Sequence, residues 1–148
     1  MDINLIGIIQ SCLSRGNIME KDLVLNNIVK ICSDYDSNIL NYTFDEENFG
    51  NICIYIEYEN IILFRFIRER GEHWTEIIIG KDSLYFDDFL LAIHILEVVD
   101  NRCMETLVKS SLDITKRYRN FILQALNKKN FFRIKKEITK KKSARWNK

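Results

Sequence analysis

Between Asn51 and Gly80, hydrophobic and polar residues alternate in three β-prone runs that short polar stretches separate. In the first run, three isoleucines and then Tyr58 occupy every second position, and Cys53, Tyr55 and Glu57 stand between them. Because successive side chains of a strand point to opposite faces of its sheet, this pattern predicts strands with one buried face. Short polar turns rich in Asn and Gly join such strands into an antiparallel meander. The predicted strands span 52–58, 61–68 and 73–79, and the turn signals are Glu59-Asn60 and Arg70-Gly71-Glu72.

Helical periodicity flanks this meander on both sides, because apolar residues recur there at intervals of three and four. An alternating segment just before the meander adds a fourth strand to it. The resulting order predicts an α+β fold with N-terminal helices, a four-stranded antiparallel meander, and C-terminal helices that end in a basic helical tail. The flanking elements are a short helix after Asp2, helices over 20–35, 87–99 and 103–127, a strand over 39–44 and a connector over 81–86.

Composition narrows the class of protein without identifying a reaction. A chain of 148 residues with 47% hydrophobic and 29% charged residues is typical of one soluble domain with a real core. No apolar stretch approaches the roughly 20 residues of a membrane-spanning helix, and the N-terminus lacks the positive region of a secretory signal. The four cysteines are scattered, which favours buried thiols in a reducing cytosol and a cytoplasmic location.

The net charge of +1 conceals two oppositely charged parts. Residues 1–115 contain nine Lys or Arg against twenty Asp or Glu, whereas residues 116–148 contain thirteen basic residues and one acid, Glu137. An acidic body should attract basic protein surfaces, and a basic arm should attract polyanions. We therefore divide the chain into a single α+β domain over 1–127 and a basic C-terminal arm over 128–148.

Motifs that carry catalytic or metal chemistry are lacking in the sequence. The two histidines, His73 and His94, have no partner at metal-ligand spacing, and the five glycines stand alone, so no phosphate-binding loop is formed. No nucleophile elbow of the GxSxG type is present. We therefore expect a protein that is not an enzyme and that needs no cofactor or metal.

Acidic residues gather on and around the predicted meander. Glu57 and Glu59 share one side of a strand, and three more glutamates lie near the following hairpin. One interpretation is a solvated sheet rim whose charge prevents edge-to-edge pairing. The other is an acidic patch that steers and docks a basic partner. Arg65, Arg68 and Arg70 lie among these acids and would neutralise part of the patch.

Two stretches carry a resemblance to a known class of proteins. The stretch FRFIRERGEHWTEIIIG ends one strand in the turn Glu69-Arg70-Gly71 and begins the next strand. The stretch SLYFDDFLLAIHIL leads through a tyrosine into an amphipathic helix. With these stretches, residues 38–100 resemble small bacterial immunity proteins, the cytosolic antidotes encoded beside contact-dependent and other polymorphic toxins. The resemblance includes no catalytic residue.

This resemblance implies that the chain binds one toxin domain stoichiometrically and blocks its active site or substrate surface. Toxins that act on nucleic acid tend to be basic, so an acidic inhibitor suits a nuclease. Aromatic residues would anchor the complex, because Tyr and Trp are favoured at binding hot spots. The predicted partner-binding residues are Glu57, Glu59, Glu69, Glu72, Trp74, Glu76, Asp82, Tyr85, Asp87 and Asp88.

The competing hypothesis is a nucleic-acid-binding protein that acts through the arm. Its basic residues would neutralise phosphates and its aromatic rings would stack on bases. Alternatively, the arm solubilises the chain, packs on the acidic body, or adsorbs to an anionic membrane surface. The predicted nucleic-acid-binding residues are Lys128, Lys129, Phe131, Phe132, Arg133, Lys135, Lys136, Lys140, Lys141, Lys142 and Arg145.

Overall fold

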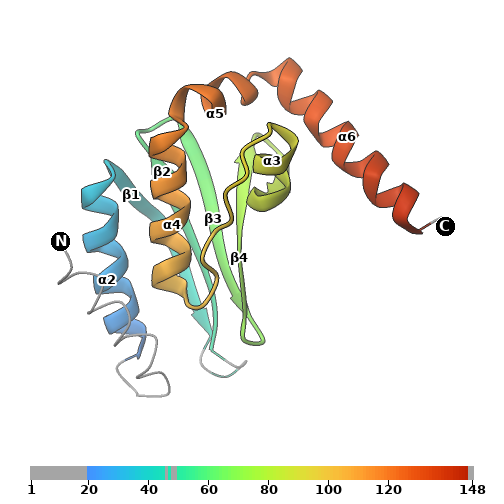
Figure 1. The fold of residues 1–148 in the computed structure, drawn as a ribbon. Coiled ribbons are helices and arrows are strands. Elements are labelled where there is room, and N and C mark those ends of the chain that lie inside the picture. The colour runs from blue at the N-terminus through green and yellow to red at the C-terminus, as the bar shows by residue number, and fades with distance from the viewer. Residues whose placement is uncertain (1–19, 46, 48–49, 147–148) are drawn as a thin grey trace.

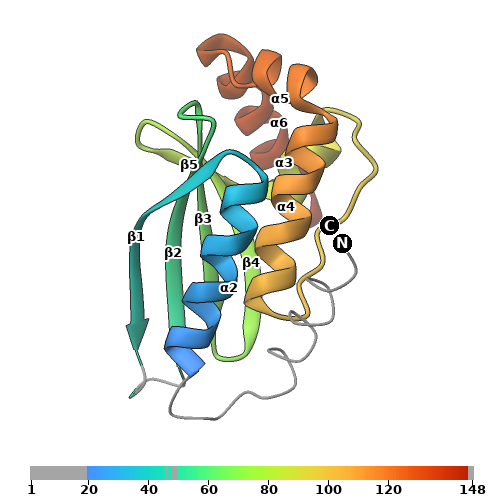
Figure 2. The same ribbon diagram turned by 90° about the vertical axis from the view of Figure 1, so that its left-hand side faces the viewer.

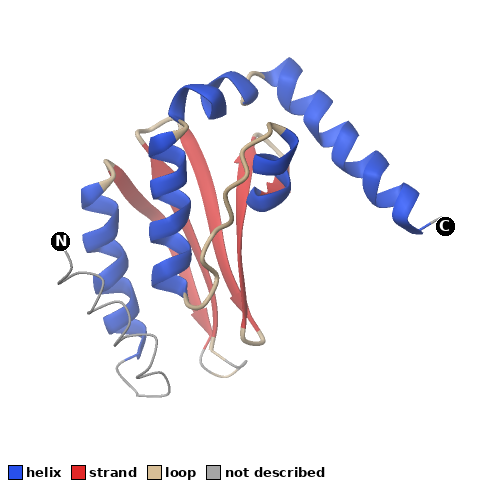
Figure 3. Cartoon of the chain, viewed as in Figure 1, coloured by secondary structure: helices blue, strands red, loops and turns tan. Residues whose placement is uncertain are grey.

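The computed structural model describes residues 20–45, 47 and 50–146, so the short helix expected after Asp2 lies outside the described residues. Helices and an antiparallel sheet are segregated along the chain, which confirms the predicted α+β class (Figure 3). The elements are α2 (Glu20–Asp34), β1 (Ser37–Asp45), β2 (Asn51–Tyr58), β3 (Ile62–Glu69), β4 (Glu72–Ile79), β5 (Asp82–Tyr85), α3 (Phe86–Ala92), α4 (Met104–Arg117), α5 (Arg119–Ala125) and α6 (Lys128–Trp146).

The described sheet has five strands in the order β1-β2-β3-β4-β5, one more than predicted. The additional strand, β5, lies within the segment expected to be a connector and pairs with the second half of β4. Its four residues contain one buried side chain, Leu84, and so show too little alternation to be recognised from the pattern. Gly80, at a φ of +58°, makes the turn into this strand.

The two central hairpins differ in their loops. Arg70 and Gly71 have positive φ angles of 52° and 81° and join the paired residues Glu69 and Glu72, which is a two-residue turn. In the other hairpin, the predicted two-residue turn would pair Tyr58 with Ile61, but Tyr58 pairs with Ile62. The loop is therefore one residue longer than predicted. Ile61 is the additional residue and is 57% exposed.

Two predicted helices end earlier than expected. The helix expected over 87–99 stops at Ala92, where His94 takes a φ of +63° and the N–H of Ile95 donates to the carbonyl of Leu90. This is a Schellman cap, which closes the helix with a residue in the left-handed conformation. Leu96, which falls within the expected helix, is 86% exposed. The helix expected over 103–127 is divided at Tyr118 into α4 and α5.

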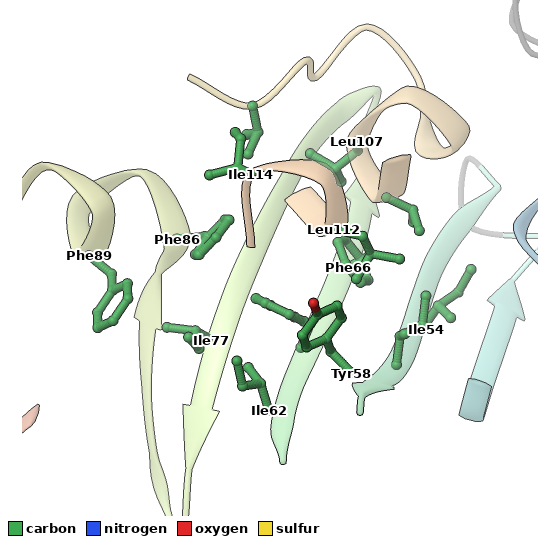
Figure 4. Close-up of a cluster of buried hydrophobic side chains, with 14 of the residues drawn as sticks. Ile54, Tyr58, Ile62, Phe66, Ile77, Phe86, Phe89, Leu107, Leu112 and Ile114 are labelled. Atoms are coloured by element: carbon green, nitrogen blue, oxygen red, sulfur yellow. The ribbon is translucent and has the colours of Figure 1, made fainter. Parts of the chain in front are cut away.

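The core lies between the sheet and the helices that cover one of its faces. Helix α4 contacts β3 and β4, α2 contacts β1 and α4, and α3 contacts β4 and β5. Figure 2 shows α2 and α4 side by side along the strands. The layer between the sheet and these helices is filled by phenylalanines and isoleucines of β2, β3 and β4 and by leucines of α4 (Figure 4).

A chain of aromatic rings extends this core to the C-terminal helix. Phe64 of β3 meets Phe86 edge-on at 5.2 Å between ring centroids, Phe86 stacks on Phe89 at 6.3 Å, and Phe89 meets Phe131 of α6 at 6.5 Å. Phe131 and Ile134 are buried, so one side of α6 is packed against α3. The basic arm is therefore a helix that contributes to the core, and it extends beyond the sheet in Figure 1.

The cysteines do not share one environment. Cys32 is a buried free thiol, as expected, whereas Cys53 is free but half-buried on the sheet. Cys103 is buried in a disulfide bond, which corrects the expectation of reduced thiols at that position, because sequence spacing does not show which cysteines meet. Among the described helices, none is long and apolar enough to cross a membrane.

Candidate functional site

The face of the sheet opposite the helices carries side chains that remain half-exposed or exposed. Along β2, β3 and β4, buried and more exposed residues alternate, which puts the more exposed set on the side away from α2, α3 and α4. We call this surface the open face. It consists of Cys53, Tyr55, Glu57, Leu63, Arg65, Ile67, Glu69, Glu72, Trp74, Glu76, Ile78 and Tyr85.

A row of side chains crosses the middle of the open face, and hydrogen bonds link its first three members. The register places Tyr55, Arg65, Glu76 and Tyr85 opposite one another on four neighbouring strands. The Arg65 guanidinium donates from Nε to Glu76 Oε1 at 2.9 Å and from Nη1 to the Tyr55 hydroxyl at 3.3 Å. The indole N–H of Trp74 donates to the other oxygen of Glu76 at 2.9 Å. This network fixes both aromatic rings in place before any partner arrives.

The charges inside this row satisfy each other. The hydrogen bond with Tyr55, and then the contact with Glu76, raise the pKa of Arg65 above its ordinary range, so its positive charge is retained at every physiological pH. Because Arg65 and Glu76 form an ion pair, they contribute little net charge to the surface. The row is therefore a rigid polar strip that requires no counter-charge from a partner.

Apolar side chains flank this strip on both sides. The register puts Cys53, Ile67 and Trp74 in one neighbouring row, and it puts Leu63 beside Ile78 in the other. Each is half-exposed, so the open face combines a polar centre with apolar borders. Fully buried interface centres in protein complexes have this combination of aromatic, aliphatic and Arg side chains.

Glutamates that form no ion pair within the described part of the chain stand toward the ends of the open face. Glu69 and Glu72 lie directly opposite each other at the β3–β4 turn, an arrangement of like charges that destabilises a hairpin. Glu57 lies toward the other end of the strands, in register with Leu63. With Arg65 and Glu76 cancelling, and with the exposed Arg70 of the β3–β4 turn offsetting part of the remaining charge, these three glutamates leave the open face acidic.

A hollow of about 550 Å³ lies at the border of the open face, where β5 ends beside β4. Trp74 and Tyr85 line it from the open face, with Glu72 between the aromatic rings and the turn. Such a hollow can receive a side chain of a partner between two aromatic anchors. It is lined by Gly71, Glu72, His73, Trp74, Tyr85 and Asn101.

The structure thus brings six of the ten predicted partner-binding residues to one surface and separates the other four from it. Those on the open face are Glu57, Glu69, Glu72, Trp74, Glu76 and Tyr85. Arg65, Leu63 and Ile78 also lie on the open face but are not among the predicted site residues. Their alternation with buried neighbours is the sequence pattern that indicates this position.

The four remaining predicted residues hold helices in place. Glu59 forms an ion pair with Arg119 of α5 at 2.6 Å, and Asp82 pairs with Lys135 of α6. Asp88 pairs with Lys142 at 3.1 Å. Asp87 accepts a hydrogen bond from the backbone N–H of Val99 at 3.3 Å, and burial raises the pKa of its carboxyl.

Helix α6 has two unlike sides. Its inner side carries the buried Phe131 and Ile134, and also Lys135 and Lys142, which pair with the acids of β5 and α3. Phe131 is 3% exposed, so it is not available to stack on a base as the sequence suggested. The side chain of Arg145 lies outside the described part of the chain.

The outer side of α6 is basic and exposed. At 3.6 residues per turn, its members fall within about 100° of the helix circumference. Among the described residues, none of the four cations in this set forms an ion pair, and Lys136 stands over the Phe132 ring with 4.7 Å from Nζ to the centroid. We call this set the outer stripe: Lys129, Phe132, Arg133, Lys136 and Lys140.

Lys128 and Lys141 are also exposed and flank the outer stripe. Within the described residues, no group of three or more His, Cys, Asp or Glu side chains is arranged to hold a metal ion.

In comparisons with known proteins, no family model, no curated protein and no solved structure matches this chain.

Proposed function

We propose that this chain is a bacterial immunity protein that neutralises a cognate toxin domain, a nuclease, by stoichiometric binding through the open face. The single observation that carries the proposal is the open face itself, with its fixed aromatic residues, apolar borders and acidic ends. The two stretches that resemble immunity proteins supply most of the relevant elements, because 64–80 forms the β3–β4 hairpin and 83–96 forms the end of β5 with α3.

The dimensions of the open face suit a protein partner. Three strands of eight residues and one of four, spaced about 4.8 Å apart, cover roughly 15–20 Å by at most about 25 Å. This is of the same order as the about 800 Å² that each partner buries in a complex of standard size. Trp74 and Tyr55 are already held by Glu76 and Arg65, so their ordering adds little to the free-energy cost of association.

The charge of the open face suits a basic partner. Glu57, Glu69 and Glu72 have no ion pair in the described structure, and the facing Glu69 and Glu72 repel each other until a cation approaches them. Proteins that act on nucleic acid tend to carry basic surfaces, so a nuclease domain meets the electrostatic requirement. Inhibition by occlusion needs no catalytic group on the inhibitor, which agrees with the lack of catalytic motifs in the sequence.

The first experiment is recovery of the tagged protein from its source cells, with and without nuclease treatment. We expect one protein partner at a stoichiometric ratio that nuclease treatment does not remove, and we expect that partner to be a toxin domain with nuclease activity that the chain suppresses. Absence of a stoichiometric protein partner, or a partner whose activity the chain leaves unchanged, would refute the proposed function.

The second experiment tests the surface with a matched control. The double variant Glu69→Lys/Glu72→Lys should weaken binding to that partner at least tenfold. The control Asp22→Lys/Asp34→Lys makes the same change in net charge at exposed positions of α2, on the helical side of the sheet, and should change binding less than twofold. Equal losses in the two variants would mean that only net charge matters, and the open face would then not be the contact surface.

The third experiment tests the aromatic anchor. Trp74→Ala should weaken binding by about 2 kcal/mol or more, the usual threshold of a hot spot, which corresponds to roughly 30-fold. Phe121 is 66% exposed on α5, a helix that contacts α4 and α6, so Phe121→Ala is the matched loss of an aromatic side chain and should leave binding unchanged.

A further inference from the structure

We propose that the outer stripe of α6 binds single-stranded nucleic acid, as an activity separate from the protein-binding surface of the open face. The proposal goes beyond the proposed function, because it uses a different element and a different ligand. It rests on the juxtaposition of four exposed cations and one exposed aromatic ring on the side of α6 that faces away from α3.

The acidic body neutralises only one side of the arm. Lys135 and Lys142 are held by Asp82 and Asp88, and the ammonium of Lys142 also stands 5.0 Å from the centroid of the Tyr85 ring. None of the outer-stripe cations forms an ion pair in the described structure, although Glu137, one turn from Arg133 and Lys140 on the same helix, offsets part of their charge. The fold therefore separates lysines that bind the body from cations that remain available for an external anion.

The spacing of the outer stripe suits a polyphosphate chain. Lys129 and Lys140 are eleven positions apart, so the stripe extends about 16 Å along the helix axis at 1.5 Å per residue. A stripe of this length can contact several consecutive phosphates of one strand. A small anion such as free phosphate would engage only one or two of the four cations.

The exposed ring favours a single strand. Phe132 is 59% exposed and lies between the cations along the stripe. Single-stranded nucleic acid is bound by basic grooves or surfaces that carry aromatic rings on which unpaired bases stack. In a duplex the bases are stacked on one another and cannot reach this ring.

An anionic membrane is a poorer ligand for the same surface. Helices that lie on membranes bury an apolar face among the lipids and keep their cations at the headgroups. The apolar side of α6, Phe131 with Ile134 and Ile138, is instead packed toward the body. Phe132 is the one apolar side chain of the outer stripe that could be buried among lipids.

The test is fluorescence polarisation of a labelled single-stranded oligonucleotide, about 12 nucleotides long, with the intact chain at salt concentrations from about 50 to 200 mM. If four cations contact phosphates, the logarithm of the affinity should fall with the logarithm of the salt concentration at a slope of about −3. Lack of binding at the lowest salt, or binding that salt does not weaken, would overturn the proposal.

Two pairs of lysines on the same helix supply the matched comparison. Lys136→Gln/Lys140→Gln removes two cations from the outer stripe, and Lys135→Gln/Lys142→Gln removes two from the inner side. The outer variant should reduce the magnitude of the salt slope by about 1.4, whereas the inner variant should leave it unchanged. Equal effects of the two variants would overturn the proposal, because net charge alone would then explain binding.

The aromatic contribution has its own control. Phe132→Ala should weaken binding roughly 5- to 150-fold, the range for loss of one stacked base. Phe121→Ala removes a ring of similar exposure, 66% against 59%, from α5 and should have no effect. Binding to vesicles that contain phosphatidylserine, without binding to the oligonucleotide, would assign the outer stripe to membranes and overturn the proposal.

Discussion

Gly50 offers the sharpest test of how the sheet is held together at the start of β2. It has a φ of +64°, and its carbonyl accepts hydrogen bonds from Nε and Nη2 of Arg68 at 2.9 and 2.6 Å. A Cβ added at this position would lie 2.8 Å from Arg68 Nη2. Gly50→Ala therefore introduces both backbone strain and a collision with a cation that is only 7% exposed.

The two contributions can be separated by size. A left-handed conformation costs an alanine about 1 kcal/mol relative to glycine. Displacement of the guanidinium weakens hydrogen bonds that involve a charged group, which contribute about 1.5–3 kcal/mol. We therefore expect Gly50→Ala to lower the free energy of unfolding by about 3 kcal/mol.

Gly80 is the matched control. Its φ of +58° imposes similar backbone strain, but no atom lies within 4 Å of the position of an added Cβ. Gly80→Ala should therefore lower the free energy of unfolding by only about 1 kcal/mol. Urea unfolding followed by far-UV circular dichroism measures both values. The comparison requires that the free energy of unfolding falls with urea concentration at the same slope in each variant and the original chain.

A double-mutant cycle completes the test. In the background Arg68→Met, which retains an unbranched side chain but lacks the guanidinium, Gly50→Ala should cost no more than Gly80→Ala. Equal destabilisation by the two glycine substitutions in the original background would show that the contact with Arg68 is not important. The same loss from Gly50→Ala with or without Arg68 would lead to the same conclusion.

Three further predictions concern the core and the helix ends. His94→Gly should raise the free energy of unfolding by about 0.5–1 kcal/mol in the same assay, because the cap of α3 requires a φ of +63° there, and His94→Ala should give no gain. Ser111→Ala should cost about 1–3 kcal/mol by leaving the buried Thr75 hydroxyl without its 2.9 Å partner, and adding Thr75→Val should recover much of that loss. Burial raises the pKa of Cys32 to about 11 from 9.0, so the folded state retains a proton that the unfolded state releases; stability should fall as the pH rises from about 9 to about 11, and Cys32→Ala should reduce this fall in urea titrations.

The sequence pattern predicts the meander because local preferences and alternation agree there. Gly71 at the β3–β4 turn and Asn60 at the β2–β3 turn take the positive φ angles that their residue types favour. The pattern fails where tertiary packing overrides it. Leu96 continues the apolar spacing of α3, but the Schellman cap at His94 has already ended the helix and Ile95 enters the core from an irregular segment.

The open face was harder to predict because it depends on register. The expected two-residue turn at Glu59-Asn60 would pair Tyr55 with Phe64, whereas the additional loop residue Ile61 pairs Tyr55 with Arg65. A shift of one residue exchanges the two faces of a strand, so the Tyr55–Arg65–Glu76 row follows only from the observed pairing. Individual acids could be selected from the sequence, but the network that orders the surface could not.

The charge asymmetry of the chain has a structural consequence that a count of charges does not reveal. In the described part of the chain, ion pairs join residues 116–148 to the acidic body: Arg119, Lys135 and Lys142 meet Glu59, Asp82 and Asp88, and Arg117 meets Glu97 and Asp113. The paired acids are neutralised within the chain, so they do not attract a basic partner protein. The acids of the open face remain available for that partner. The ion pairs also fix the orientation of α6, so that its remaining cations point outward. Because the open face and the outer stripe share no residue, a variant that abolishes one activity should leave the other intact, and the two proposals can fail independently.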